Sequence, residues 1–162
     1  MTDRYLDDFT VGEKFTTGGI TFTEASIIDF AMHFDPQAFH LDVKEASESI
    51  YEGLIASGFH TISVCFRLFI QTGTLAACSM GSPGIDDLKW LAPVRPGDTL
   101  RTEVEVVEVK PSSRREDRGV LRLQYSAINQ DDKPVSMFIV NHLAKRQPNE
   151  RDPLTSIYQG RD

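Results

Sequence analysis

Alternating apolar and polar residues in the second half of the chain predict long β-strands. From Leu100 to Val106, apolar or threonine side chains alternate with arginine and glutamate, which is the period of a strand with one buried face. The alternation slips by one residue at Val106 and Val107, as a β-bulge requires. Turn sequences separate this strand from further strands, which we expect at residues 85–94, 119–130 and 135–147.

The first half of the chain predicts two short strands and two helices. Residues 13–22 are rich in threonine and broken by two glycines, as expected for brief strands around a turn. Apolar residues then recur at helical spacing over 24–34, with Thr23 placed to cap the helix. This helix should end at Asp35, because a proline follows it. Residues 43–49 predict a short exposed helix.

The stretch that begins at Gly58 is apolar on nearly every side of a helix. Apolar residues continue to Ile70 without forming a polar face, so we expect other elements to enclose this helix. Ser57 and Gly58 lie where the helix begins.

One apolar helix followed by long antiparallel strands predicts an α+β fold, in which an antiparallel sheet curls around a central helix. A chain of 162 residues fits a single domain over residues 1–162. We expect its core over about 10–146 and a polar tail over 147–162 that is extended or partly disordered. A second copy commonly covers a long apolar edge strand, so we expect a homodimer or a higher homo-oligomer.

Charge and cysteine usage narrow the partners and the compartment. The net charge of −7 and the pI near 5.1 argue against nucleic acid or an anionic membrane as a partner. Residues 1–8 carry charges and do not resemble a signal peptide, and polar residues interrupt the most apolar stretch, 59–78. Cys65 and Cys78 therefore indicate reduced core thiols in a cytoplasmic protein.

Asp35 and His40 are the candidate catalytic groups. They lie five positions apart on either side of Pro36, and at about 100° per residue a continuous helix would point them well apart. They can converge on a loop that Pro36 rigidifies, where they could serve as a general acid and a general base. A second interpretation is structural: an aspartate before proline is often a turn former, and a histidine after phenylalanine can be half-buried.

The other histidines favour structural roles. His33 falls on the helix before Asp35 and His142 on the final strand, and His60 lies nearer the predicted site. Cysteine and histidine do not occur at metal-ligand spacing, and a glycine-rich nucleotide motif is absent from the sequence. We therefore expect neither a metal nor a redox cofactor.

Three blocks of sequence, at residues 34–42, 53–58 and 88–98, carry a resemblance to a known family. They read FDPQAFHLD, GLIASG and LKWLAPVRPGD. In this order and spacing the chain resembles the MaoC-like family of hotdog-fold dehydratases and (R)-specific enoyl-CoA hydratases. The resemblance implies a hotdog fold and a dimer. It departs from the family pattern in three places, with Gln37 for a usual asparagine, Ala38 for a frequent proline and Ser57 for a common histidine.

The resemblance also implies an activity. It places Asp35 and His40 at the catalytic positions and directs the backbone N–H of Gly58 at a thioester carbonyl. The expected reaction is reversible hydration of a 2-enoyl thioester, carried by coenzyme A or an acyl carrier protein, as in fatty acid metabolism. His40 would be the base toward water, and Asp35, at least partly protonated in a desolvated site, would protonate C2. Residues expected to bind substrate are Gln37, Phe39, Ser57 and His60, with Gln37 either orienting the pair or capping the loop.

Two other functions stay open. Hotdog thioesterases often carry a catalytic carboxylate on the central helix, and this chain has no aspartate or glutamate between Gly53 and Ile85. A non-catalytic subunit that binds acyl thioesters could share the fold. Arg95, Arg114 and Arg115 could contact the phosphates of a carrier, although exposed arginines in turns are commonly just solvated.

Overall fold

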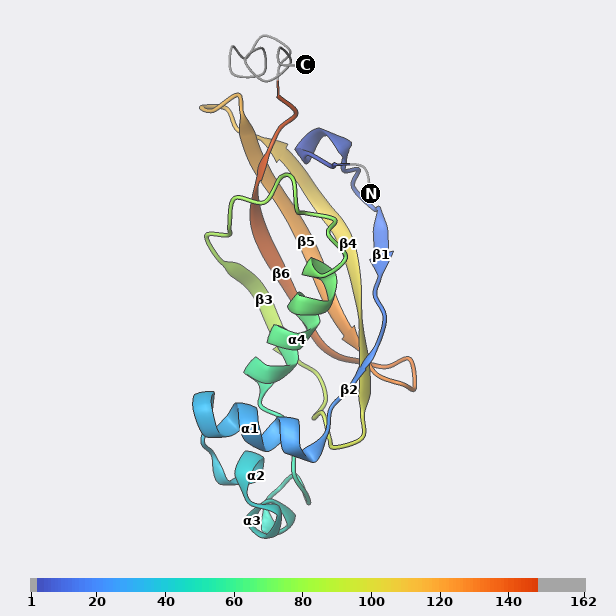
Figure 1. Ribbon diagram of the computed structural model, residues 1–162, viewed down its shortest axis with the longest axis vertical. Helices are drawn as coiled ribbons and strands as arrows, with labels where there is room; N and C mark the ends of the chain where they lie inside the picture. Colours follow the sequence, from blue (N-terminus) through green and yellow to red (C-terminus); the bar gives the residue numbers. More distant parts are fainter. Residues whose placement is uncertain (1–2, 149–162) are drawn as a thin grey trace, which may run out of the picture.

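The computed structural model describes residues 3–148 of the chain. The 3-10 helix η1 and four α-helices precede the long strands, and α4 runs beside these strands (Figure 1). In chain order the elements are η1 (Leu6–Asp8), β1 (Lys14–Thr16), β2 (Ile20–Thr21), α1 (Glu24–Phe34), α2 (Ala38–Leu41), α3 (Val43–Glu48), α4 (Gly58–Ile70), β3 (Ile85–Trp90), β4 (Thr99–Pro111), β5 (Arg118–Ile128) and β6 (Pro134–Lys145).

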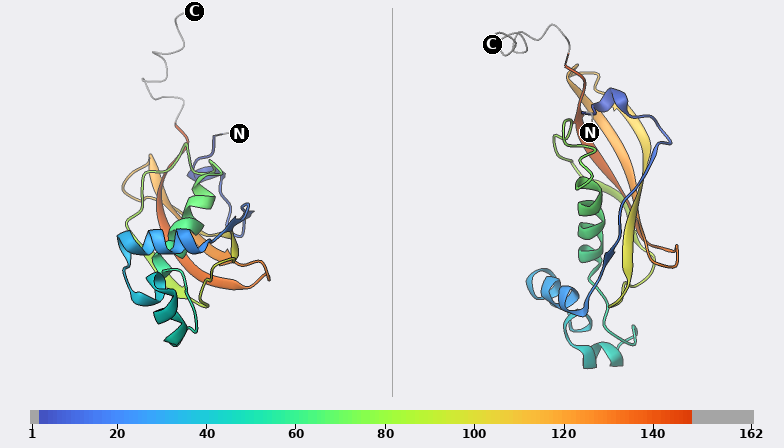
Figure 2. Two further views of the ribbon diagram at one scale, coloured as in Figure 1. Left: turned by 60° about the horizontal axis from the view of Figure 1, so that its bottom comes forward. Right: turned by 45° about the vertical axis from the view of Figure 1, so that its right-hand side comes forward.

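The strands form one curved antiparallel sheet in the order β1-β4-β5-β6-β3, and β2 also pairs with β4. α4 lies along one face of this sheet, and α1, α2 and α3 gather at one end (Figure 2). The predicted bulge in β4 is confirmed, because its pairing with β5 shifts register between Val106 and Glu108. The predicted sheet curled around a long helix is therefore confirmed.

The core lies between α4 and the facing side of the sheet. Leu121, Leu123 and Tyr125 alternate along β5 and are fully buried. The ring of Tyr125 meets that of Phe69 from α4 edge-on, with centroids 5.5 Å apart. Leu6 is also fully buried, so packed residues begin before the expected start of the core at about residue 10.

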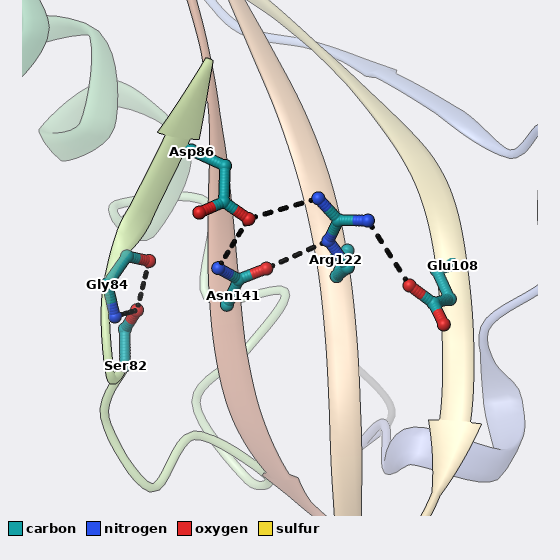
Figure 3. A network of polar contacts seen from close by, with 6 residues as sticks. All are labelled: Ser82, Gly84, Asp86, Glu108, Arg122 and Asn141. Carbon is teal, nitrogen blue, oxygen red and sulfur yellow. Dashed lines mark hydrogen bonds and ion pairs between the residues drawn. The ribbon is translucent and has the colours of Figure 1, made fainter. Parts of the chain in front are cut away.

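The opposite face of the sheet carries a polar network (Figure 3). Arg122 of β5 donates hydrogen bonds to Asn141 of β6 at 2.8 Å, to Asp86 of β3 at 3.1 Å and to Glu108 of β4 at 3.3 Å. The amide of Asn141 also donates to Asp86 at 2.9 Å. These side chains link four strands, and they fix Asp86 on the face turned away from α4.

β3 is shorter than the predicted strand over residues 85–94, because it ends at Trp90. Beyond it, the chain turns toward the segment before α4, where the amide of Ala56 donates to the carbonyl of Val94 at 2.8 Å. β3 also contains an irregularity that we did not predict, since its pairing with β6 shifts register between Asp86 and Lys89.

α4 is covered by the sheet on one side and open on the other. Phe59, Phe66 and Ile70 are 55%, 36% and 40% exposed. Within a single chain, the expectation that other elements enclose α4 is therefore wrong. The sheet covers one face of α4, and α1 contacts its first turn, where Phe30 stacks on His60. Among residues 3–148, none of the helices is both long and apolar enough to cross a membrane.

The last described residues are tied to the start of the chain. Arg146 forms an ion pair with Asp7 at 2.7 Å, and the amide of Gln147 donates to the same carboxylate at 3.1 Å. The predicted tail over residues 147–162 lies mostly outside the described residues, which end at 148.

Candidate active site

The candidate acid and base lie at the junction of α1 and α2. The hydroxyl of Thr23 accepts a hydrogen bond from the amide of Ser26, so α1 begins as predicted. α1 ends with Asp35 as its C-cap residue, and Pro36 follows it. His40 lies in the one-turn helix α2 and not on a loop, which differs from our expectation. The change of direction between α1 and α2 is what brings the two side chains together.

Asp35 and His40 form a close pair. The Nε2 atom of His40 is 3.3 Å from Oδ2 of Asp35. The side chain of His40 is 5% exposed and that of Asp35 is 16% exposed, so water reaches the carboxylate more readily than the imidazole. The predicted convergence of these two groups is therefore present in the structure.

Hydrogen bonds fix the ring of His40. Its Nδ1 lies 2.8 Å from the carbonyl oxygen of Ile55. Since a carbonyl can accept but not donate, Nδ1 carries a hydrogen and Nε2 faces Asp35. With both groups fully deprotonated, a lone pair of Nε2 would face a carboxylate. The contact is attractive when the pair holds one proton, either on Nε2 or on the carboxyl group.

Two donors hold the carboxylate of Asp35. The hydroxyl of Ser57 donates to Oδ2 at 2.6 Å, and the side-chain amide of Gln37 donates to Oδ1 at 2.7 Å. Partial burial raises the pKa of Asp35, but these two hydrogen bonds and the nearby His40 outweigh burial and lower the pKa below its usual value. Our expectation of a partly protonated Asp35 is therefore wrong, because these donors favour the charged form more than desolvation opposes it.

Gln37 and Ser57 thus act on Asp35. Gln37 is the N-cap residue of α2, but its side chain makes no capping hydrogen bond there. Of its two expected roles, the contacts favour orientation of the pair. Ser57 is fully buried, and its hydroxyl also accepts a hydrogen bond from the amide of Phe59 at 3.2 Å.

The pair opens into a cavity of about 510 Å³. Gly58, the first residue of α4, lines the same cavity, and its amide donates to no partner within residues 3–148. A helix N-terminus presents free N–H groups and a partial positive charge. The cavity therefore brings together an acid–base pair and a free backbone donor. The remaining lining residues are Gln37, Phe39, Tyr51, Ile55, Ala56, Phe59, Thr61, Trp90, Leu91, Ala92, Pro93 and Val94.

Of the other predicted residues, Phe39 reaches the cavity and His60 does not. The ring of Phe39 contacts His40 edge-on, with centroids 4.5 Å apart. His60 is 8% exposed and is stacked on Phe30 at 4.6 Å, with Phe22 at 4.7 Å. Burial lowers the pKa of His60 to about 4, and its Nδ1 has no hydrogen-bond partner within the described residues.

The three arginines that could have met phosphates lie in two separate places. The guanidinium of Arg95 donates to the backbone carbonyl of Tyr51, which supports the loop before the cavity. Arg114 and Arg115 lie in the connection between β4 and β5, at the end of the sheet away from α1, α2 and α3 (Figure 1).

Several residues that line the cavity were not singled out in the sequence analysis. Three of them make specific contacts: Tyr51, Ile55 and Trp90. Ile55 acts through its backbone carbonyl, which leaves no trace in residue type. Ile55 and Trp90 each belong to one of the three matching blocks, and that membership was a usable signal. In the part of the chain that is described, no three His, Cys, Asp or Glu side chains cluster as metal ligands would.

Comparison with known proteins supports a relationship along most of the chain. A model of the MaoC like domain family matches residues 8–127. The uncharacterized protein YdeM of Bacillus subtilis is 34% identical over 141 residues, which cover 87% of this chain and 99% of that protein.

Solved structures show the same architecture. The MaoC-like dehydratase from Rhodospirillum rubrum is 34% identical, with a TM-score of 0.83 over 90% of this chain and 99% of that chain. The R-hydratase PhaJ1 from Pseudomonas aeruginosa is 24% identical, with a TM-score of 0.70 over 88% of this chain and 86% of that chain. At that identity the second likeness shows the fold alone. Together the two confirm the predicted hotdog fold.

Proposed function

The chain belongs to the MaoC-like dehydratase family, and on that premise we propose that it adds water reversibly to the double bond of a 2-enoyl thioester. The product is a 3-hydroxyacyl thioester, and its carrier is coenzyme A or an acyl carrier protein. One observation carries the proposal: the His40 and Asp35 side chains meet at 3.3 Å in the wall of the cavity that Gly58 also lines.

The amide of Gly58 has the first role in this reaction. An isolated alkene resists addition of water, so the double bond must be polarised through its conjugated carbonyl. The carbonyl oxygen accepts a hydrogen bond from the N–H of Gly58 at the positive end of α4, and this bond strengthens as negative charge develops on the oxygen. Loss of one such donor typically costs about 2.7 to 4 kcal/mol in the transition state.

The pair of Asp35 and His40 moves the protons. The carboxylate of Asp35, which its lowered pKa keeps ionised, takes a proton from the bound water while the water oxygen bonds to C3. His40 gives the Nε2 proton to C2, where the electron pair of the double bond arrives by way of the polarised thioester. The pair begins and ends with one proton, and dehydration follows the reverse path. This division of roles is the opposite of the one expected from the sequence.

Hydration of crotonyl-CoA tests the proposal. Loss of the enoyl-thioester absorbance is followed for the unmodified protein, for Asp35→Asn and for His40→Gln, with free thiol monitored in parallel. Both variants should lose about 10²- to 10⁴-fold in rate, the usual contribution of general acid–base catalysis. The matched controls Asp29→Asn and His33→Gln alter exposed residues of α1 and should keep full activity.

The other possible functions give distinct results in the same assay. Release of free thiol without hydration would indicate a thioesterase. Binding of acyl-CoA without any turnover would indicate a non-catalytic subunit. Full activity in both Asp35→Asn and His40→Gln would remove the proposed catalytic roles even if the protein hydrates crotonyl-CoA.

We also propose that the protein works as a homodimer in the cytoplasm. β3 lies at the edge of the sheet, and the open side of α4 exposes Phe59, Phe66 and Ile70, so a second copy could cover both. Sedimentation should give a dimer, and Phe66→Asp should shift it toward monomer, whereas Ile50→Asp at a 91% exposed site should not. A monomeric unmodified protein would contradict this proposal.

A further inference from the structure

Trp90 packs directly against the first residue of α4. A Cβ atom placed on Gly58 would lie 2.3 Å from Cε2 and 2.4 Å from Nε1 of the Trp90 indole. Real Cβ atoms do not come this close to other heavy atoms, so the indole occupies the space that a side chain at position 58 would need. Because of this contact, position 58 accommodates a glycine but not a residue with a side chain.

The indole also forms part of the cavity wall. Trp90 lines the cavity together with Gly58, Asp35 and His40, and its ring meets Phe59 edge-on with centroids 5.8 Å apart. Trp90 is still 51% exposed. A large apolar surface that remains open beside a free backbone donor is suited to contact a ligand bound at that donor.

The irregularity in β3 is what turns Trp90 toward α4. Asp86 pairs with Ile139 of β6, whereas Lys89 pairs with Met137, so β3 advances three residues while β6 advances two. One extra residue reverses the side on which every later side chain lies. Asp87 takes up this residue with a φ of 51°, an uncommon conformation for a residue other than glycine.

Contacts on both sides of the irregularity hold this arrangement. Asp86 is bound on the outer face by Arg122 and Asn141, as Figure 3 shows. On the other side, Trp90 pairs with Ser136, whose hydroxyl donates to the carbonyl of Lys89 at 3.1 Å. Without the bulge, Trp90 would lie on the same face as Asp86, away from the cavity. The strand is therefore built to present the indole to α4.

We propose that Trp90 is a specificity-determining residue whose indole limits the bulk that an acyl thioester can carry next to its carbonyl carbon. The proposal rests on the proposed function, because it takes the N–H of Gly58 as the donor to that carbonyl. When the carbonyl oxygen of an acyl group accepts a hydrogen bond from this N–H, the C2 atom of the acyl group lies beside the indole. A straight chain passes along the ring face, whereas a branch at C2 meets it.

Selectivity between a linear and a branched substrate tests this inference. The ratio of kcat/KM for 2-methylcrotonyl-CoA to kcat/KM for crotonyl-CoA is measured in the unmodified protein, in Trp90→Phe and in Trp90→Ala. We expect Trp90→Ala to raise the ratio by about 10-fold or more, the usual range for one carbon atom in an apolar pocket, and Trp90→Phe to give a smaller rise. Ile85→Ala is the matched control, because Ile85 lies on the same strand with 50% exposure and does not line the cavity.

A binding measurement separates this inference from the proposed function. Trp90 is the single tryptophan of the chain, so its fluorescence reports on this position alone. Butyryl-CoA, which has no double bond to hydrate, should change the emission in a saturable way, whereas free coenzyme A should not. Calorimetry with isobutyryl-CoA and butyryl-CoA should show that Trp90→Ala improves the relative affinity for the branched ligand.

The outcomes are distinguishable. If crotonyl-CoA is not hydrated but the emission and the affinity ratio respond as described, the proposed function fails and the role of Trp90 stands. If hydration occurs while the selectivity ratio is the same in Trp90→Ala and in Ile85→Ala, the role of Trp90 is wrong and the function stands. An unchanged emission with butyryl-CoA also overturns the role of Trp90.

Discussion

The hydroxyl of Ser57 donates a 2.6 Å hydrogen bond to Oδ2 of Asp35, which joins the start of α4 to the end of α1. The same hydroxyl accepts from the amide of Phe59, so its proton is directed at the carboxylate. One buried serine thereby aligns the candidate base with the helix that bears the candidate backbone donor.

Replacing this serine should change the pH dependence of the reaction. In Ser57→Ala, Asp35 loses a donor that lowers its pKa, so the pKa should rise. Because the ionised carboxylate is the proposed base, the acid limb of the kcat/KM profile should move to higher pH. The rate on the plateau should fall by about one to two orders of magnitude, the value of a hydrogen bond to a charged group.

Ser63→Ala, at an exposed position of the same helix, is the control for this experiment. Its profile should overlay that of the unmodified protein. An acid limb that stays in place in Ser57→Ala would show that Asp35 is not the group whose ionisation the profile reports.

A methyl group at position 58 should inactivate the protein through the indole of Trp90. In Gly58→Ala the new Cβ would meet the ring at 2.3 Å, and displacement of the ring or of the helix start should reduce kcat/KM by about 10²- to 10³-fold. The double variant Gly58→Ala with Trp90→Ala should recover part of this loss. A double variant no more active than Gly58→Ala would assign the loss to another cause, such as obstruction of the amide itself.

His60 should make the fold less stable in mild acid. Burial lowers the pKa of His60 to about 4, whereas in the unfolded chain it is about 6.5. As the pH falls below about 6.5, the unfolded chain binds a proton that the folded chain does not, so stability decreases by up to about 1.4 kcal/mol per pH unit until the folded pKa is reached. His60→Leu removes this contribution.

Urea unfolding near pH 7 and near pH 5 measures the effect. The variant should lose less stability between the two conditions than the unmodified protein does. His33→Gln, an exposed change on α1, should follow the unmodified protein. An equal loss of stability in His60→Leu would mean that His60 is already protonated in the folded state.

The two cysteines should resist thiol reagents in the native protein. Both are buried, and burial raises the pKa of Cys65 to about 12 and raises that of Cys78. Since the thiolate is the reactive form, a chromogenic disulfide should label neither in the native state and both after denaturation. Rapid native labelling would contradict this burial. Unreactive cysteines would also keep the background low when thioester hydrolysis is monitored.

The sequence was most informative where local chemistry determines structure. Thr23 caps α1 as its side chain predicts, and the slip of alternation at Val106 marks the register shift in β4. By contrast, the bulge in β3 depends on the outer-face partners of Asp86. Those partners come from β5 and β6, and no local pattern indicates them, although two adjacent aspartates do interrupt the alternation there.

For the site, the pairing of Asp35 with His40 was predictable and its protonation state was not. Pro36 indicates a change of direction, and the two residue types suggest acid–base chemistry. The pKa of Asp35 instead depends on how the donor of Ser57, which is distant in sequence, competes with burial. The open side of α4 was also unpredictable, because an apolar helix does not reveal whether its own chain or a second copy covers it.

The candidate site is divided between two parts of the fold, the helices α1 and α2 on one side and the start of α4 on the other. Asp35 caps the end of α1 and His40 lies on α2, whereas Gly58 begins α4, and the hydroxyl of Ser57 links the start of α4 to Asp35. Local opening generally costs less free energy than global unfolding. Thermal inactivation should therefore precede loss of the β-sheet signal, and amide exchange should be faster in α1 and α2 than in β5. In this protein, activity would report the docking of the first helices and not the integrity of the sheet.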